Sequence, residues 1–401
     1  MAYTRYYRNI QITNNENSDI EGYQVAIKIE DPSFLLKADP NNLIFKDGNT
    51  ILPYWVEYWR DYALIWTKID MPASQTKEIT LYYGGYIDWI EQDGDSVFEF
   101  FDDFNSINLD ENKWRIAVDA DGGIDVNNIK KSCVRMPLFD NQNGSHPEIL
   151  CNISIPNNII VEATFLVTGL SQNTQNIGLS FTKTSNDNYH EIMYTVSYKD
   201  SKILRVVRES NWKQWKSATI NYIENKWHKL TMIKQNSQFE FLYGMNSKVN
   251  IATITDNYSF NDPRVGITSG SYASISSSDY GFCDYIFVRK KISSIPVIQI
   301  DTEQISLVWH NNPNEQSVLS GITCDKNGNP ITGKNVNIYF LKKDTGEIIG
   351  KATSNATDGS WNSTIDINPN TKVLSVFALE GDYNGDTDIA GAEFDITQEG
   401  S

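Results

Sequence analysis

The sequence lacks the residues and patterns that mark several large classes of protein. Its 401 residues include only four cysteines, Cys133, Cys151, Cys283 and Cys324. They are widely separated and none belongs to a Cys-x-x-Cys pair, so we expect neither a disulfide framework nor a zinc site. Each is instead expected to be a small buried apolar residue. No run of about 18 apolar residues occurs, so no membrane-spanning helix is expected.

Positive charge is scarce, and so is helical periodicity. Lys and Arg number 34 against 51 Asp and Glu, which gives a net charge of −17 and a pI near 4.7. A surface of that sign repels phosphate backbones, so nucleic acid is not an expected partner. No long segment has apolar residues at i, i+3, i+4 and i+7, and no heptads are sustained. Long helices and coiled coils are therefore excluded.

Aromatic and β-branched residues are abundant instead. Aromatics make up 12% of the chain, and many segments are rich in Ile, Val, Thr, Tyr and Asn, a composition that favours strands and turns. Apolar and polar residues alternate along residues 23–29, which is the period of a half-buried strand. A chain of this length is expected to hold several domains. We predict an all-β protein with three tandem β-sandwich domains, joined by polar, turn-rich linkers, at residues 1–90, 97–292 and 318–401.

The first region contains six short runs typical of strands, and Asp47-Gly48-Asn49 forms a hairpin turn between two of them. It closely resembles a small domain family of unassigned function that precedes laminin-G-like modules in bacterial, archaeal and viral surface proteins. That resemblance implies an architecture, a small β-sandwich, and no particular chemistry. The matching residues are 7–8, 10–13, 19–25, 47–48, 52–57, 66, 68, 72 and 79–84.

The stretch VFEFFDDFNSINLDENKW at residues 97–114 opens the second region. An apolar run cut by an Asp pair is typical of a strand that ends in a turn. Segments 225–230, 265–267 and 284–289 supply further strand motifs. Together they resemble the laminin-G-like, concanavalin-type β-sandwiches, which implies two packed antiparallel sheets in a jelly roll. The residues that carry the opening motif are Phe101, Asp102, Asp103, Phe104, Leu109 and Trp114.

The third region carries the turn motifs DKNGNP, DTG and TDGSW between apolar runs. It resembles immunoglobulin-like and transthyretin-like domains, which implies a small Greek-key sandwich. Residues 376–379 and 382–384 also resemble the end of a C-terminal domain of many phage tail proteins. Oxygen-bearing side chains alternate there as in a calcium loop, although the glycine and glutamate of such loops are misplaced. A calcium site and a polar hairpin are the two interpretations of Asp382, Asn384, Asp386 and Asp388.

Catalytic motifs are missing from all three regions. Glucanases on the concanavalin-type fold carry E-x-D-x-x-E on one strand, but Ser96 and Gly385 replace the final Glu of the two partial matches. His190-Glu191 lacks the second His of a zinc-hydrolase helix, and neither G-x-S-x-G nor G-x-G-x-x-G occurs. We therefore expect no enzyme activity and, apart from calcium, no cofactor.

Two aromatic groups are candidates for ligand binding. Residues 52–59 are either a sugar-stacking platform or, as we favour, part of the core and rim of the first domain. The second group lies on or beside the central strands of the second domain, where aromatic faces and cations together suit a polyanionic glycan. Its alternative is an ordinary solvated sheet edge with protective lysines. The second group consists of Tyr189, His190, Tyr194, Arg205, Arg208, Trp212 and Trp215.

The first residues, MAYTRYYRNIQIT, contain no apolar core of a secretory signal. Modules of extracellular type without such a signal indicate either assembly into a virus particle with release by lysis, or a signal that has been removed, and the Met1-Ala2 start favours the first. We therefore expect a non-enzymatic virion protein, either a tail fibre or baseplate accessory or a capsid decoration protein, present in multiple copies. Its expected partners are other virion proteins and a host-surface polysaccharide or protein. A prokaryotic cell-surface adhesin and a glycan hydrolase with an unrecognised site are the alternatives.

Overall fold

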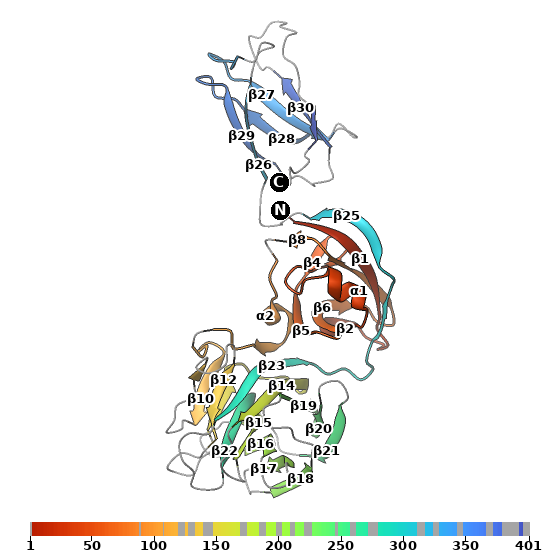
Figure 1. Cartoon of the computed structure of the whole chain (residues 1–401), viewed down its shortest axis with the longest axis vertical. Coiled ribbons are helices and arrows are strands. Elements are labelled where there is room, and N and C mark those ends of the chain that lie inside the picture. The colour runs from red at the N-terminus through yellow and green to blue at the C-terminus, as the bar shows by residue number, and fades with distance from the viewer. Residues whose placement is uncertain are drawn as a thin grey trace.

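The computed structural model confirms an all-β chain whose strands form three groups of sheets (Figure 1). Among the described residues only α1 (Pro32–Lys37) and α2 (Gly94–Val97) are helices. No helix in this part of the chain has the length and apolarity needed to cross a membrane. The structure describes residues 2–87, 90–106, 108–118, 125–126, 133–138, 147–168, 175–183, 190–197, 203–208, 213–219, 227–244, 248–256, 262–271, 280–310, 317–323, 329–342, 348–365, 372–378 and 393–395.

The first domain packs a seven-stranded sheet against a three-stranded sheet. Its alternating residues behave as the sequence predicts, because Tyr23, Val25 and Ile27 are all buried in the core between the two sheets. The larger sheet draws five strands from this region: β1 (Ala2–Thr13), β3 (Ile44–Asp47), β4 (Thr50–Leu52), β7 (Thr76–Tyr83) and β8 (Tyr86–Ile87). The smaller sheet has the order β2 (Ile20–Ile29), β6 (Ala63–Met71), β5 (Tyr54–Trp59).

The larger sheet is completed by residues that follow the second domain. β24 (Val297–Ile300) pairs with the end of β1, and β25 (Gln304–His310) pairs with its beginning. Much of the expected linker at 292–317 is therefore part of the first domain's sheet, and the first domain is assembled from two separate segments. Local patterns do not reveal such a pairing, because the strands are far apart in the sequence.

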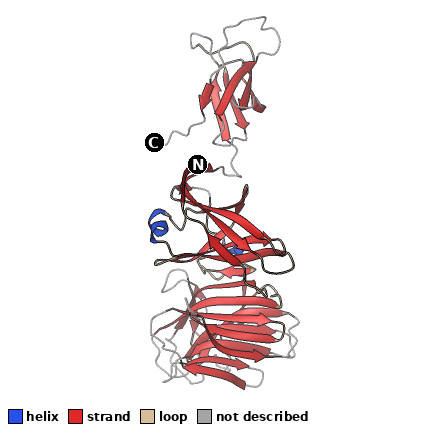
Figure 2. Cartoon of the chain, turned by 90° about the vertical axis from the view of Figure 1, so that its right-hand side faces the viewer, coloured by secondary structure: helices blue, strands red, loops and turns tan. Residues whose placement is uncertain are grey.

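The second domain consists of a seven-stranded and an eight-stranded antiparallel sheet, which lie one over the other (Figure 2). A large apolar core fills the space between them and includes the buried Cys151 and Cys283. The first sheet has the order β10 (Trp114–Val118), β13 (Glu148–Cys151), β22 (Pro263–Ser271), β15 (Gln175–Lys183), β16 (His190–Ser197), β17 (Ile203–Arg208), β18 (Lys213–Thr219). The second has the order β11 (Asp125–Val126), β12 (Val134–Pro137), β23 (Tyr280–Lys290), β14 (Asn158–Thr168), β19 (His228–Gln235), β20 (Gln238–Tyr243), β21 (Val249–Thr255), with β9 (Phe100–Asp102) beside β23.

The Asp pair of the opening motif has a structural role. The buried Asp102 side chain accepts hydrogen bonds from the Trp114 indole nitrogen at 2.5 Å and from the backbone N–H of Phe104 at 2.7 Å. Trp114 packs between Phe100 and Phe104, with ring centroids 5.0 and 5.8 Å away. Asp102 therefore fixes the turn after β9 and anchors the tryptophan in the core of the second domain.

The third domain has the two-sheet arrangement that its turn motifs predict. A two-stranded sheet pairs β26 (Ser317–Ile322) with β29 (Ser360–Ile365). The four-stranded sheet has the order β28 (Ile348–Thr353), β27 (Asn337–Lys342), β30 (Lys372–Ala378), β31 (Glu393–Asp395).

Candidate functional site

The candidate ligand residues of the second domain lie on neighbouring strands at one edge of the seven-stranded sheet. His190 begins β16, Arg205 and Arg208 lie on β17, and Trp215 lies on β18. The backbone therefore brings these positions into one region. Tyr189 and Trp212 lie outside the described residues.

Tyr194 does not belong to an exposed platform. Its side chain is completely buried, its hydroxyl donates a hydrogen bond to the carbonyl of Leu242 at 3.0 Å, and its ring packs against Phe241 at 5.2 Å. Both partners belong to β20 of the opposite sheet, so Tyr194 is a core residue that links the two sheets. The prediction that it contacts a ligand is wrong, because the alternation along β16 turns it inward together with Ile192.

Two further predictions have different outcomes. Asp382, Asn384, Asp386 and Asp388 lie outside the described residues, so the calcium interpretation stays a prediction. Within the described part of the chain no group of three or more His, Cys, Asp or Glu residues has a metal-binding arrangement. In residues 52–59 the core interpretation is right, since Tyr54 and Trp55 are buried.

The first two domains share an apolar cluster. Trp55 and Trp66 of the first domain contact Phe98 in the connecting segment and Phe287 on β23 of the second domain. Phe98 stacks on Phe287 with ring centroids 4.3 Å apart. Aromatic pairs of this kind contribute about 0.5–1.5 kcal/mol each beyond the area that they bury. The two domains are therefore packed against each other through side chains that are buried between them.

A buried ion network lies beside this cluster. Glu57 on β5 accepts hydrogen bonds from the Trp66 indole nitrogen and the Tyr285 hydroxyl, both at 2.7 Å, and pairs with Lys229 on β19. Lys229 also contacts a carboxylate oxygen of Glu162 on β14 at 2.5 Å. Because Glu57 belongs to the first domain and Lys229 to the second, the network bridges the domain interface.

Glu162 is the centre of the network. Besides Lys229 it pairs with Lys248 at 2.8 Å and receives hydrogen bonds from Arg289 Nη2 at 2.8 Å and Nε at 3.1 Å. Its side chain is only 1% exposed and that of Lys229 only 3%. Strand geometry explains the placement, since Glu162 on β14 lies opposite Thr231 on β19, on the sheet face that points away from the core.

Electrostatics keep this network charged. Burial alone raises the pKa of Glu162, but the three surrounding cations outweigh burial and hold its pKa well below the ordinary value. Burial likewise lowers the pKa of Lys229, yet Glu162 and Glu57 together raise it above the ordinary value of lysine. For Lys248 the balance differs, because burial and the neighbouring Lys229 and Arg289 lower its pKa despite the contact with Glu162.

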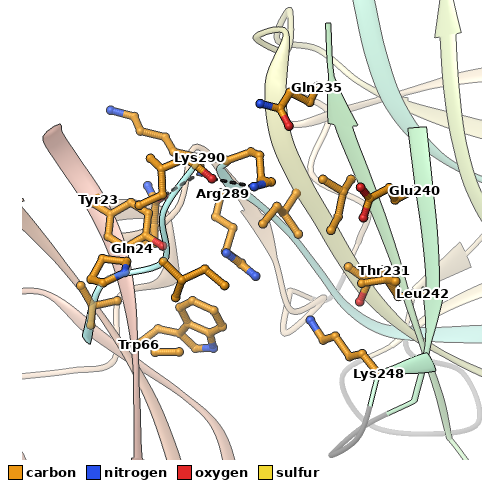
Figure 3. A pocket seen from close by; sticks show the side chains of 18 of the residues that line it. Tyr23, Gln24, Trp66, Thr231, Gln235, Glu240, Leu242, Lys248, Arg289 and Lys290 are labelled. Carbon is orange, nitrogen blue, oxygen red and sulfur yellow. Dashed lines mark hydrogen bonds between the residues drawn. The ribbon is translucent and has the colours of Figure 1, made fainter. Parts of the chain in front are cut away.

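A cavity of about 460 Å³ opens next to this network, between the first two domains (Figure 3). This volume lies within the range of roughly 300–1,000 Å³ that is typical of ligand pockets. β2 and β6 form one wall, and β14, β19, β20 and the end of β23 form the other. The cavity is lined by Tyr23, Gln24, Val25, Ala26, Trp66, Ile160, Thr231, Ile233, Gln235, Glu240, Leu242, Lys248, Arg289, Lys290, Lys291, Ile292, Ile295, Pro296 and Ile298.

One lining side chain has an unmet hydrogen bond. The Thr231 hydroxyl is buried, with the residue 1% exposed, and makes no hydrogen bond to any described residue. Leaving a buried hydroxyl without a partner costs about 1–3 kcal/mol. By contrast, Gln24 at the opposite wall is well satisfied, because it donates to Glu99 and accepts from the backbone N–H of Lys290, both at 2.9 Å. Thr231 therefore lies in the wall of the cavity with a hydroxyl that no described residue satisfies.

Sequence reasoning missed this site, although one signal pointed to it. Glu162 interrupts the apolar run IIVEATF of β14, and Lys229 is followed by the apolar run of β19. A charged residue inside such a strand is buried only when it is paired, so both were candidates for a buried ion pair. The partner Glu57 lies in another domain, and only the tertiary structure identifies it.

Comparison with known proteins gives a family match that spans parts of the first two domains. Residues 39–117 match the family described as "Domain of unknown function (DUF2341)". This match confirms the resemblance of the first region to a family of unassigned function from residue 39 onward, whereas the resembling residues 7–8, 10–13 and 19–25 lie outside it. It extends through α2 and β9 to β10, so it includes the Asp102–Trp114 anchor. No curated protein gives a significant match to the sequence.

Several solved structures are similar at low identity. The GH43 protein BlXynB of Bacillus licheniformis is 13% identical with a TM-score of 0.39, over 59% of this chain and 46% of that one. A laminarinase of Flavobacterium sp. UMI-01 is 14% identical with a TM-score of 0.38, over 48% of this chain and 100% of that one. A lichenase from a mouse hindgut metagenome is 12% identical with a TM-score of 0.37, over 48% and 99%. All three are named as glycan hydrolases or members of a glycoside hydrolase group, and at these scores they assign no residue and no activity to this chain.

Proposed function

We propose that this protein is a non-enzymatic saccharide-binding protein whose ligand occupies the cavity between the first two domains. The observation that carries the proposal is the cavity itself, which both domains line and which holds the unpartnered Thr231 hydroxyl. A site built from two domains orients its ligand through both walls, and the packed aromatic cluster keeps those walls in place.

The lining suits the two kinds of surface that a sugar ring presents. Amide, hydroxyl and charged groups such as Gln235, Thr231 and Glu240 are partners for sugar hydroxyls. Apolar side chains such as Ile233 and Leu242 fit the C–H faces of the ring. A pocket with mostly apolar walls and a few placed polar groups is the usual design of a small-molecule site.

The same lining favours binding without hydrolysis. Cleavage of a glycosidic bond generally needs two carboxyl groups, about 5–5.5 Å apart in retaining enzymes and farther apart in inverting ones. Glu240 is the one carboxylate among the described lining residues, and Glu162 behind the wall is held by three cations. A carboxylate whose pKa is held that low is a poor proton donor at neutral pH. Presentation of the site in several copies on a virus particle, or on a prokaryotic cell as an adhesin, stays a prediction from the sequence.

A saccharide panel tests the proposal on the full chain. The panel is screened for binding, and each hit is titrated by calorimetry against the wild type, Ile233→Trp and Val249→Trp. Ile233→Trp fills the cavity, whereas Val249 is 56% exposed and does not line it. We expect binding to be weakened about tenfold or more by Ile233→Trp and unchanged by Val249→Trp. The proposal fails if no saccharide binds, or if the hits bind Ile233→Trp as tightly as the wild type.

A further inference from the structure

The charge of the cavity is opposite to that of the chain. Four of its lining side chains are cationic, Lys248, Arg289, Lys290 and Lys291, and one, Glu240, is a carboxylate. The whole chain has 34 basic and 51 acidic residues. A cationic cavity in an acidic protein attracts anions and discriminates against cations.

The carboxylates behind the wall do not cancel this charge. Adding the buried Lys229 and the carboxylates that pair with these cations, Glu57, Glu99 and Glu162, leaves five cations against four carboxylates. The excess is concentrated on one side, because Glu162 has three cations around a single carboxylate. The network therefore has one positive charge more than its own carboxylates balance.

Resting on the proposed function, we infer that the cavity selects acidic saccharides and binds their carboxylate or sulfate group between Lys248, Arg289 and Thr231. Figure 3 shows the nitrogen-bearing ends of Lys248 and Arg289 directed into the space between the two domains, and Thr231 also lines this space. Lys248 directly precedes β21, Arg289 lies near the end of β23, and Thr231 lies in the middle of β19. One anionic group contacted from three segments would be recognised by its charge and its shape.

Each of the three side chains has a hydrogen-bond donor available for an anionic group. Arg289 donates hydrogen bonds to Glu162 from Nε and Nη2, and the remaining guanidinium nitrogen, Nη1, carries two further donors. Lys248 keeps a side chain that is 30% exposed and has three donors, one of which contacts Glu162. Thr231 supplies the buried hydroxyl that has no described partner. Burial and the neighbouring Lys229 and Arg289 lower the pKa of Lys248, and a ligand anion would offset these effects.

The test compares two probes that share a sugar backbone and differ in whether their carboxyl groups are charged or esterified. Trigalacturonic acid and its fully methyl-esterified form are titrated against the full chain by calorimetry, together with a sulfated galactan oligosaccharide as a second anion source. We expect an acidic probe to bind at least about tenfold more tightly than the ester, with an affinity that falls as salt rises. Binding of the sulfated probe but not of the uronate assigns the site to sulfate, and the reverse assigns it to carboxylate.

Variants locate the anion. Lys248→Met removes one charge and leaves Glu162 paired with Lys229 and Arg289, while Thr231→Val removes the hydroxyl at equal size. Both variants should weaken binding of the acidic probe by about tenfold. Lys248→Met should also reduce the salt dependence of that binding. Lys46→Met on β3, outside the cavity, and Thr255→Val on β21, which is exposed, are the matched controls and should leave binding unchanged. If Lys248→Met lowers the melting temperature, Thr231→Val carries the test.

The outcomes separate the two proposals. If the ester or a neutral saccharide binds as tightly as the acid, and Ile233→Trp abolishes that binding, the cavity binds saccharides and the inference about charge is overturned. If an acidic probe binds but neither variant weakens it, the anion lies elsewhere and the inference is also overturned. If no saccharide of either kind binds, the proposed function itself fails.

Discussion

Glu57 and Lys229 belong to different domains, and their side chains form an ion pair in which each is only 3% exposed. Removing two charges from water is costly, and a buried pair repays that cost only with good geometry and further hydrogen bonds. Here Trp66, Tyr285 and Glu162 supply those bonds. The pair therefore fixes the register between the domains, because any displacement would leave two charges buried without partners.

Replacing Lys229 with methionine should be strongly destabilising. The substitution keeps the volume of the side chain but leaves Glu57 and Glu162 facing each other across the interface. Breaking a buried pair from one side typically costs about 3–5 kcal/mol. Urea denaturation of the full chain, followed by tryptophan fluorescence, measures the loss. Lys28→Met breaks the solvent-exposed pair with Glu30 and should change little; equal effects of the two variants would contradict the prediction.

The buried ion network should make the stability of the folded protein depend on pH, with a maximum over an intermediate range. The pKa of Glu162 is lower in the folded than in the unfolded chain, so its stabilising effect is complete above about pH 4.5 and is lost as the pH falls through its folded value. The pKa of Lys229 is raised, so its effect is complete below about pH 10.5 and is lost as the pH rises through its folded value. Melting temperatures measured across this range should form a plateau that falls at both ends. A continuous rise of stability below pH 4 would contradict the assignment.

Asp284 should affect the pH dependence of stability in the opposite direction to Glu162. Burial, with the nearby Asp103, raises its pKa to about 6, so the folded state favours the protonated form. Its contribution is complete below about pH 3.8 and is lost as the pH rises through about 6. Asp284→Asn should therefore stabilise the protein above pH 6, by at most about 3 kcal/mol, and should have almost no effect near pH 3.5. Calorimetric melting of wild type and variant at the two pH values checks this, and equal stabilisation at both would refute it.

β24 and β25, which the sequence predicts to be part of a linker, should show the slow amide exchange of sheet residues. The amides of β24 and β25 that bond to β1 are expected to exchange with deuterium slowly, as do those of β7 on its other side. The amides of residues 292, 293 and 295, which lie between the strands, should exchange quickly and provide the internal control. Limited proteolysis should then spare 297–310. Rapid exchange and cleavage within that range would show that the first domain is complete without these strands.

The sequence by itself determined the fold class and much of the core. Alternation along residues 23–29 predicts which side chains of β2 are buried, because successive residues of a strand point to opposite faces. The opening motif likewise predicted a strand and turn at Asp102 and Trp114, and the structure shows why each residue is needed there. These features depend on neighbours in the chain, so local patterns are sufficient.

Only the tertiary structure decided whether particular side chains point into the core and which distant segments of the chain pair. Tyr194 is an aromatic residue of the kind that forms a binding platform, but its position in β16 directs its side chain into the core. β24 has the character of a linker, yet it pairs with β1. Glu162 and Arg289 meet because their strands pair within the second domain, and only the packing of the two domains adds Glu57 to their network beside the cavity. Contacts of this kind join residues that are far apart in the sequence. The strand period of two residues and the helix period of 3.6 residues describe only local structure and cannot predict them.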